Sequence, residues 1–198
     1  MKLDILTRRY AKAFMDLAKQ NDIVDRCHDD LRLVKNTFDS NEELRTMIHQ
    51  PFISKESKQN ILSEIFKDRT QSITVDLLRL IIDKDRDEIL ADLYDAFYEL
   101  YLEYKKIAVV TVTAAVDLDE HTTNRIINIM RHKIADSYTI KVEKKIDKNI
   151  IGGFIVRYKD YEYDASVKST LRRLQSVSED NLFYLMSRGL SKEESFML

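Results

Sequence analysis

The first 105 residues place apolar side chains at the spacing of an α-helix, and they contain no glycine. Steps of three and four residues join the apolar positions of the first predicted helix, at Leu6, Tyr10, Ala13, Phe14, Leu17 and Ala18. The next helix keeps the same alternation, at Val24, Cys27, Leu31, Val34 and Phe38. Such a period predicts amphipathic helices whose apolar faces pack against one another.

Polar breaks divide this half into six helices. Asn41 opens the third helix, Pro51 ends it, and Ser54 caps the fourth. The fifth is apolar on almost every side, which makes it either central or in need of a second partner. Its apolar residues are Leu77, Leu78, Leu80, Ile81 and Ile82. A sixth starts near Arg86 and runs to about Tyr104, so residues 1–105 predict a compact six-helix bundle.

After Lys105 and Lys106 the period becomes that of β-strands. One alternating run holds Val110, Val112, Ala114 and Val116, and a second holds Tyr138, Ile140 and Val142. Between them, Asp117 and Glu120 have the spacing of a helix capping box. Residues 106–178 therefore predict a small α/β domain of about four strands and two helices, so that the whole chain is a two-domain α+β protein. For the tail 179–198, a short helix is one option.

Two of the chain's three glycines, Gly152 and Gly153, are adjacent and precede Phe154. In a chain so poor in glycine, the pair indicates a positive φ or a close backbone approach before a strand. A short hairpin follows, and Asp164 and Ser166 are candidate caps of a closing helix. This closing helix carries Val167, Leu171 and Leu174.

The composition of the chain restricts the classes of protein to which it can belong. Charged residues make up 33% and hydrophobic residues 44% of the 198 residues, as in a soluble globular protein. The net charge of −2 gives no electrostatic case for binding nucleic acid or anionic lipid. A single cysteine, Cys27, allows no intramolecular disulfide and indicates a reducing compartment. No apolar run is long enough to span a bilayer, and Met1 leads almost directly into a helix, as in a bacterial cytosolic protein.

No catalytic or metal-binding arrangement is visible in the sequence. The glycines cannot form a phosphate-binding loop, so the chain has no evident means of binding ATP. The four histidines have no spacing that presents two of them to one metal ion, and the acidic residues at 83–88 read as a helix N-terminus after a turn. We therefore expect no enzyme activity and no cofactor, and predict a binding or scaffold protein.

Three motifs, in this order along the chain, carry a resemblance to a known family. The first is Arg9-Tyr10-Ala11-Lys12-Ala13 with Leu17-Ala18, and the second is Pro51-Phe52-Ile53 with Lys55 and Lys58. The third and most specific is Ile151-Gly152-Gly153-Phe154 followed by Tyr163-Asp164-Ala165-Ser166-Val167. Over residues 1–178 the chain resembles the delta subunits of bacterial F-type ATP synthase, the counterparts of the mitochondrial oligomycin-sensitivity-conferring protein.

The resemblance implies a non-catalytic subunit of the peripheral stalk, or stator. In that family the helical domain sits on the catalytic head and receives the N-terminal helix of an alpha subunit in a groove between helices one and five. The second domain meets the ends of the b subunits. The subunit, present once per complex, keeps the head from turning with the rotor during proton-driven ATP synthesis. The resemblance also implies a peripheral position at the cytoplasmic face of the bacterial cell membrane, without membrane insertion.

The residues expected to line this groove are Tyr10, Ala13, Phe14 and Leu17 on helix one, and Leu77, Leu80 and Ile81 on helix five. The alternative is that these apolar positions belong to the core of the bundle. Two other functions remain open at this point: a scaffold of another rotary ATPase stalk, such as the vacuolar type, and an unrelated soluble enzyme. Long coiled helices would dominate a vacuolar-type scaffold, and the Gly-Gly hairpin argues against it.

Overall fold

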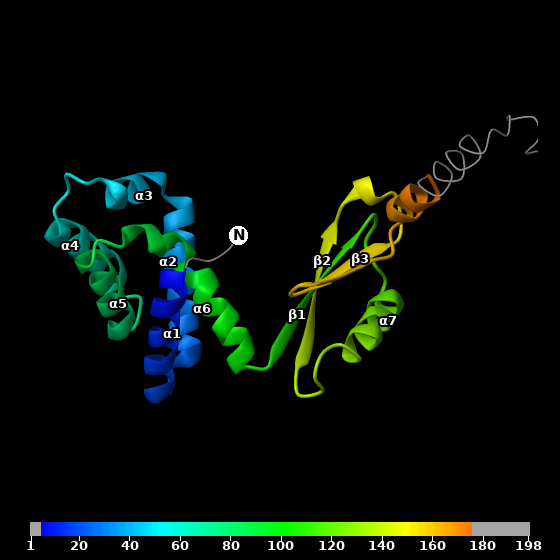
Figure 1. The fold of residues 1–198 in the computed structure, drawn as a ribbon. Coiled ribbons are helices and arrows are strands. Elements are labelled where there is room, and N and C mark those ends of the chain that lie inside the picture. The colour runs from blue at the N-terminus through cyan, green and yellow to red at the C-terminus, as the bar shows by residue number, and fades with distance from the viewer. Residues whose placement is uncertain (1–4, 176–198) are drawn as a thin grey trace, which may run out of the picture. The chain divides into compact units, whose positions relative to one another are not determined.

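The computed structural model describes residues 5–175, which form two compact units that divide between Lys105 and Lys106 (Figure 1). We call residues 5–105 the helical unit and residues 106–175 the sheet unit. Helices make up the first unit, and a mixed four-stranded sheet lies in the second. The predicted α+β class is thereby confirmed. The predicted tail 179–198 lies outside the described residues.

Six α-helices and one 3₁₀ turn share the core of the helical unit. They are α1 (Ile5–Gln20), α2 (Val24–Ser40), α3 (Glu42–His49), α4 (Lys55–Phe66), α5 (Ser72–Asp83), η1 (Asp87–Ile89) and α6 (Leu90–Tyr104). All five apolar residues predicted for the inner face of α2 are buried, which confirms the period there. Phe66, Phe97 and Leu78 are among the largest fully buried side chains.

Side-chain caps fix two of the helix starts. Asn41 Oδ1 accepts a hydrogen bond from Leu44 N at 3.0 Å, and Ser54 Oγ accepts one from Ser57 N at 3.2 Å. These two predicted starts are confirmed. The predicted start of the sixth helix near Arg86 is wrong, because the 3₁₀ turn η1 intervenes and α6 begins only at Leu90.

The two lysines of the second sequence motif tie α4 to the turn that follows α5. Lys58 Nζ donates to Asp87 Oδ2 at 2.6 Å, and both side chains are largely buried. Lys55 Nζ donates to the carbonyl oxygen of Asp83 at 2.9 Å and also pairs with the exposed carboxylate of Asp85. The motif therefore has a structural basis, since both lysines anchor one turn.

We expect Lys58→Met to lower the free energy of unfolding by about 2 kcal/mol, because it leaves the carboxylate of Asp87 largely buried without its partner. Lys55→Met is the matched control and should cost less than about 1 kcal/mol, since its ion pair is exposed. Urea denaturation of the full chain measures both. If both variants lost the same free energy of unfolding, the buried Lys58–Asp87 ion pair would not stabilise the protein more than the exposed pair of Lys55.

The sheet unit is built around a central strand. Its elements are β1 (Ile107–Ala114), α7 (Glu120–Arg131), β2 (Thr139–Ile146), η2 (Lys148–Ile150), β3 (Phe154–Tyr158) and β4 (Tyr161–Asp164), and residues 167–175 are helical. The strand order is β2-β1-β3-β4, with β1 and β2 parallel and the other two pairs antiparallel. Every second residue of β1 is buried, and α7 contributes Ile126 and Met130 to the same core.

Two local predictions in the sheet unit are wrong. Val116 lies beyond the end of β1 and is 69% exposed. The cap of α7 is Asp119, whose Oδ1 accepts from Thr122 N at 2.8 Å, and not Asp117 with Glu120. The alternating pattern continued two residues past the last paired position. Asp117 and Asp119 both precede the helix, and the capping-box spacing selected the wrong one.

The Gly-Gly pair brings the backbone close to the segment that follows the hairpin. Gly153 has φ 74°, and a Cβ placed there would lie 2.2 Å from the carbonyl oxygen of Ala165. Gly152 accepts a backbone hydrogen bond from Val167 N at 2.9 Å. Positive φ and close approach, the two demands inferred from the sequence, therefore both fall on Gly153.

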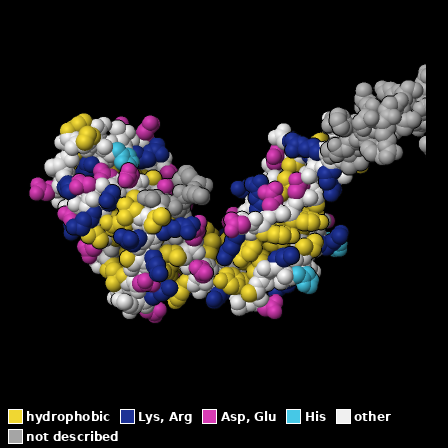
Figure 2. All heavy atoms as spheres, in the orientation of Figure 1, with side chains coloured by type: hydrophobic (Ala, Val, Ile, Leu, Met, Phe, Trp, Pro, Cys, Tyr) yellow, Lys and Arg dark blue, Asp and Glu magenta, His cyan; other side chains and the backbone are white. Residues whose placement is uncertain are grey.

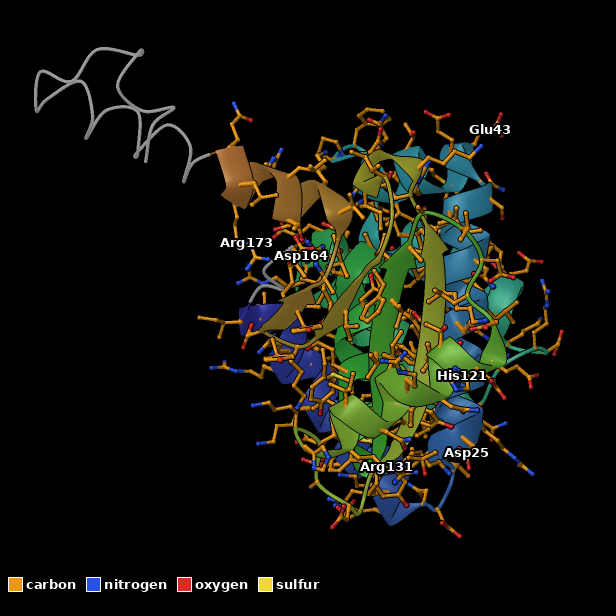
Figure 3. All side chains as sticks on the ribbon, turned by 90° about the vertical axis from the view of Figure 1, so that its right-hand side faces the viewer. Asp25, Glu43, His121, Arg131, Asp164 and Arg173 are labelled. Carbon is orange, nitrogen blue, oxygen red and sulfur yellow. The ribbon has the colours of Figure 1, made fainter. Side chains whose placement is uncertain are left out.

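The two candidate caps after the hairpin have different roles. Ser166 Oγ accepts from Ser169 N at 3.1 Å and caps the helix at 167–175. Asp164 Oδ1 accepts from Ser166 N at 2.8 Å, and this hydrogen bonding to Ser166 lowers the pKa of the Asp164 carboxyl. Figure 3 shows Asp164 near the start of this last helix. The segment from the glycines to the helix is thus one hydrogen-bonded arrangement.

Candidate functional site

Residues 5–175 contain neither a metal-binding cluster nor a reactive thiol. Within residues 5–175, no three His, Cys, Asp or Glu side chains lie close enough together to hold a metal ion. His121 and Arg131 lie at opposite ends of α7 (Figure 3), so His121 is also far from His132, which directly follows the helix. Cys27 is fully buried, and burial raises the pKa of its thiol to about 11, which keeps it protonated at neutral pH.

None of the helices within residues 5–175 has the length and apolar character needed to cross a bilayer.

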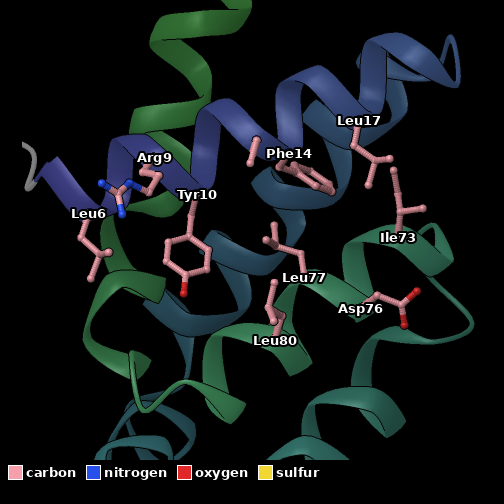
Figure 4. A pocket seen from close by; sticks show the side chains of 10 residues that line it. Leu6, Arg9, Tyr10, Phe14, Leu17, Ile73, Asp76, Leu77 and Leu80 are labelled. Carbon is pink, nitrogen blue, oxygen red and sulfur yellow. The ribbon is translucent and has the colours of Figure 1, made fainter.

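An apolar groove lies between α1 and α5 (Figure 4). Its volume is about 420 Å³. The lining residues are Leu6, Arg9, Tyr10, Ala13, Phe14, Leu17, Ile73, Asp76, Leu77 and Leu80. Eight of these ten are apolar or aromatic, so the groove suits the apolar face of another chain.

Six of the seven residues predicted for a groove meet here. They are Tyr10, Ala13, Phe14, Leu17, Leu77 and Leu80. Ile81 does not line the groove, because its side chain is 0% exposed and lies in the core of the helical unit. The placement of Ile81 in the groove is therefore wrong: on a helix that is apolar on almost every side, the sequence cannot separate the inner from the outer face. That the other six contact a partner stays a prediction.

Helix α1 carries two apolar stripes. One enters the core and consists of Ala11, Phe14, Met15 and Ala18, beside the buried hydroxyl residue Thr7. The other consists of Leu6, Tyr10, Ala13 and Leu17 and faces the groove. Leu17 is 41% exposed and Leu80, across the groove on α5, is 46% exposed. Of the stripe predicted from the sequence, Ala13 and Leu17 are exposed, whereas Leu6 and Tyr10 line the groove and also pack against the core. The stripe therefore does not serve the core alone.

Phe14 and Leu77 form the floor of the groove. Both are buried and belong to the core, yet both line the groove. The ring of Phe14 packs against that of Phe97 on α6, with 5.5 Å between the ring centroids. The floor is therefore held rigidly, whereas Tyr10, Leu17 and Leu80 rise from the walls.

A carboxylate from another helix holds the start of α5. The N-cap position, Gln71, makes no capping hydrogen bond of its own. Instead, Asp30 of α2 accepts from Gln71 N at 2.7 Å and from Thr74 Oγ1 at 2.8 Å. A carboxylate at a helix N-terminus satisfies free N–H groups and is favoured by the helix dipole. Asp30 thereby positions the α5 wall of the groove, and no signal in the sequence pointed to it.

The other end of α5 closes in a Schellman turn. Asp85 takes the left-handed conformation with φ 55°, and its N–H bonds to the carbonyl of Ile82. Arg86 N bonds to the carbonyl of Ile81, which completes the motif. With Asp30 at one end and this turn at the other, both ends of the α5 wall are fixed.

The sheet unit carries exposed apolar side chains as well. Along the helix at 167–175 they are Val167, Leu171 and Leu174, the last 63% exposed. Ile146 and Ile151, before and after η2, are also largely exposed. Figure 2 shows hydrophobic side chains of this unit gathered around β3, with charged side chains beside them. The predicted closing helix therefore presents its apolar residues to its surroundings.

Comparisons with known proteins agree on one family. The family model described as "ATP synthase delta (OSCP) subunit" matches residues 6–177. A relative from Anoxybacillus flavithermus named "ATP synthase subunit delta" is 33% identical over 175 residues, which cover 88% of this chain and 97% of the relative. One of the same name from Flavobacterium psychrophilum is 34% identical over 169 residues, with 84% and 93% covered.

Among solved structures, a chain of the Toxoplasma gondii mitochondrial ATP synthase hexamer has the same fold, with a TM-score of 0.66. It is 22% identical in sequence, and the match covers 87% of this chain and 97% of that chain.

Proposed function

Because this chain belongs to the ATP synthase delta (OSCP) subunit family, and is therefore a non-catalytic subunit of the peripheral stalk, we propose that the α1–α5 groove is its joint to the catalytic head. In this proposal the helical unit acts as a six-helix bundle that receives the N-terminal helix of an alpha subunit. Membership of the family replaces the two alternatives raised by the sequence, a vacuolar-type scaffold and an unrelated enzyme.

The observation that carries the proposal is the shape and lining of the groove. On α1 the lining runs from Leu6 to Leu17, which at 1.5 Å per residue is about 16 Å, or three helical turns. Grooves that accept an amphipathic helix offer spaced apolar pockets over such a length. Ala13, in the middle of the α1 wall, is small and lets the backbone of a guest helix approach closely.

The second joint, to the ends of the b subunits, is assigned to the sheet unit. Its support is the apolar face of residues 167–175, where Val167, Leu171 and Leu174 are each more than 40% exposed. A contiguous exposed apolar face typically marks a protein interface. One subunit per complex would then bridge head and stalk at the cytoplasmic face of the bacterial cell membrane.

A stator works by staying bound and needs no chemistry of its own. If the head turned with the rotor, proton-driven rotation would not change the catalytic sites. The joint must therefore outlast many turnovers, which a dissociation constant near 1 nM, or about −12 kcal/mol, would allow. A well-packed groove of three helical turns on a rigid floor suits this demand, because little conformational freedom is lost on binding.

Titration of a fluorescein-labelled peptide from the N-terminus of the alpha subunit of the same organism into the full chain tests the head joint. We expect saturable binding that an excess of unlabelled peptide reverses. A peptide that does not bind, while the intact chain still binds the isolated catalytic head, would move the joint to another surface and overturn the groove assignment.

We expect Tyr10→Asp to weaken peptide binding by about 50-fold, since it replaces a wall residue by a charge that the guest helix would have to desolvate. Tyr10 is only half-buried, so the helical unit should keep its fold, which circular dichroism can check. An Asp placed at Lys12, on the same helix and outside the groove lining, is the control and should leave the affinity within about twofold.

A further inference from the structure

The groove has unlike charges at its two ends. Of the ten lining residues only Arg9 and Asp76 are charged, and both are exposed. Figure 4 shows Arg9 on the side of Leu6 and Tyr10, and Asp76 towards Ile73. Within the described part of the chain, no ion pair or side-chain hydrogen bond joins either of them to a partner.

The direction of α5 places these two charges at opposite ends. Lys84 follows the C-terminal end of α5, and Figure 4 shows Leu80, near that end, on the side of Tyr10 and Ile73, near the other end, beside Leu17. The first half of α5, with Asp76, therefore lies towards Leu17. Lys84 itself is paired with Asp83 at 2.9 Å, and this hydrogen bond raises the pKa of its ammonium group. Arg9, the cation of the groove lining within residues 5–175, can thus meet a guest at that end.

A second carboxylate reinforces the acidic end. Asp16 lies seven residues after Arg9 on α1, which is two helical turns along the same side of the helix. It is exposed, and no ion pair joins it to another described residue. Along the groove lining the unpaired charge therefore changes from positive at Arg9 to negative at Asp76. Asp16, outside the lining, adds negative charge about 10 Å along α1 from Arg9.

We infer that this charge polarity fixes the orientation of the occupant, an inference that rests on the proposed function. The groove fits an amphipathic helix that carries an acidic side chain facing Arg9 and, about seven residues later, a basic side chain facing Asp76. Such a helix runs parallel to α1. The same order also suits the guest by itself, because acidic residues favour the N-terminal and basic residues the C-terminal part of a helix.

The dipole of the guest helix acts in the opposite sense, and it is the weaker effect. In the parallel orientation, the positive N-terminal end of the guest lies near Arg9. That end carries about half an elementary charge spread over free N–H groups, whereas each side-chain pair joins two full charges. Side-chain complementarity therefore decides the orientation.

Charge reversal on both partners tests the inference. The probes are the labelled alpha N-terminal peptide and a second peptide in which its acidic and basic residues are exchanged. We expect Arg9→Glu and Asp76→Lys each to lower the affinity of the full chain for the native peptide by about fivefold. The double variant Arg9→Glu/Asp76→Lys should prefer the exchanged peptide, and this reversed preference is a result that mere damage to the fold cannot produce.

The controls are Lys12→Glu and Asp39→Lys, which change the net charge equally but lie outside the groove lining. Both control variants should bind the native peptide with an affinity within about twofold of the wild type. In 1 M salt, where the Debye length is about 3 Å, the discrimination between peptides should largely vanish while apolar binding persists.

Two results overturn the inference and leave the proposed function intact. One is a native peptide that binds the wild-type chain but lacks an acidic and a basic residue at that spacing. The other is tight binding with the charge-reversed variants behaving like the controls. A peptide that does not bind at all contradicts the groove assignment itself, and with it the inference.

Discussion

The variant Ala13→Trp is expected to keep its fold and to lose at least about 100-fold of its affinity for the alpha N-terminal peptide. Ala13 lines the groove, and its side chain is exposed and not part of the core. An indole at this position would occupy the space between the walls that the guest helix needs. Because the core residues Ala11 and Phe14 are untouched, the intrinsic helix preference is the main cost to folding, well below 1 kcal/mol.

Fluorescence anisotropy of the labelled peptide measures this loss, and thermal unfolding followed by circular dichroism checks the fold. Lys12→Trp is the matched control, since it adds the same side chain one residue earlier, outside the groove lining. It should bind within about twofold of the wild type. Should both tryptophan variants bind like the wild type, the guest does not enter the groove at Ala13.

The second large effect concerns Gly153→Ala, which should destabilise the sheet unit by about 4 kcal/mol. The left-handed conformation of Gly153, with φ 74°, costs an L-residue about 1–2 kcal/mol. Its new Cβ would also lie 2.2 Å from the carbonyl oxygen of Ala165, a backbone atom that cannot turn away. Overpacking of this kind adds about 1–3 kcal/mol.

Hydrogen exchange can follow the two units separately in the same sample. We expect faster exchange at the amides of β1, β3 and β4 in Gly153→Ala, with unchanged exchange in α1 and α5 and unchanged affinity for the alpha peptide. Gly152→Ala is the matched control, because its Cβ would meet only the end of the Val167 side chain, at 3.1 Å. If Gly152→Ala destabilised the sheet unit as much as Gly153→Ala, the clash with the carbonyl oxygen of Ala165 would not be the cause of the destabilisation.

Much of the helical unit was predictable from the sequence because its helices are amphipathic. On α2, one stripe of Val24, Cys27, Leu31, Val34 and Phe38 faces the core, and the opposite side is mostly polar. On α5, apolar residues occur on almost every side, and the period could not tell Leu80, in the groove, from Ile81, in the core. That distinction depends on which neighbours α5 packs against.

Polar contacts between residues far apart in the chain could not be predicted from the sequence for a similar reason. Asp30 is 41 residues from Gln71 and 44 from Thr74, and nothing local marks it as the cap of α5. Lys58 stood out only as part of a family motif, and its partner Asp87 looked like an ordinary acid at a helix start. Such pairs become visible only when the helices are assembled.

By itself, the sequence determined the order of helices and strands, the place where the period changes near Lys105, and the strained position before β3. All three depend on local spacing or on the conformational freedom of glycine, which a linear chain records. Only the tertiary structure decided which apolar stripe of α1 stays outside the core, which residues face it from α5, and that unlike charges lie at the two ends of the groove. The two walls of a groove come from helices that are far apart in the chain. Which side chains line the groove therefore depends on how these helices pack against each other.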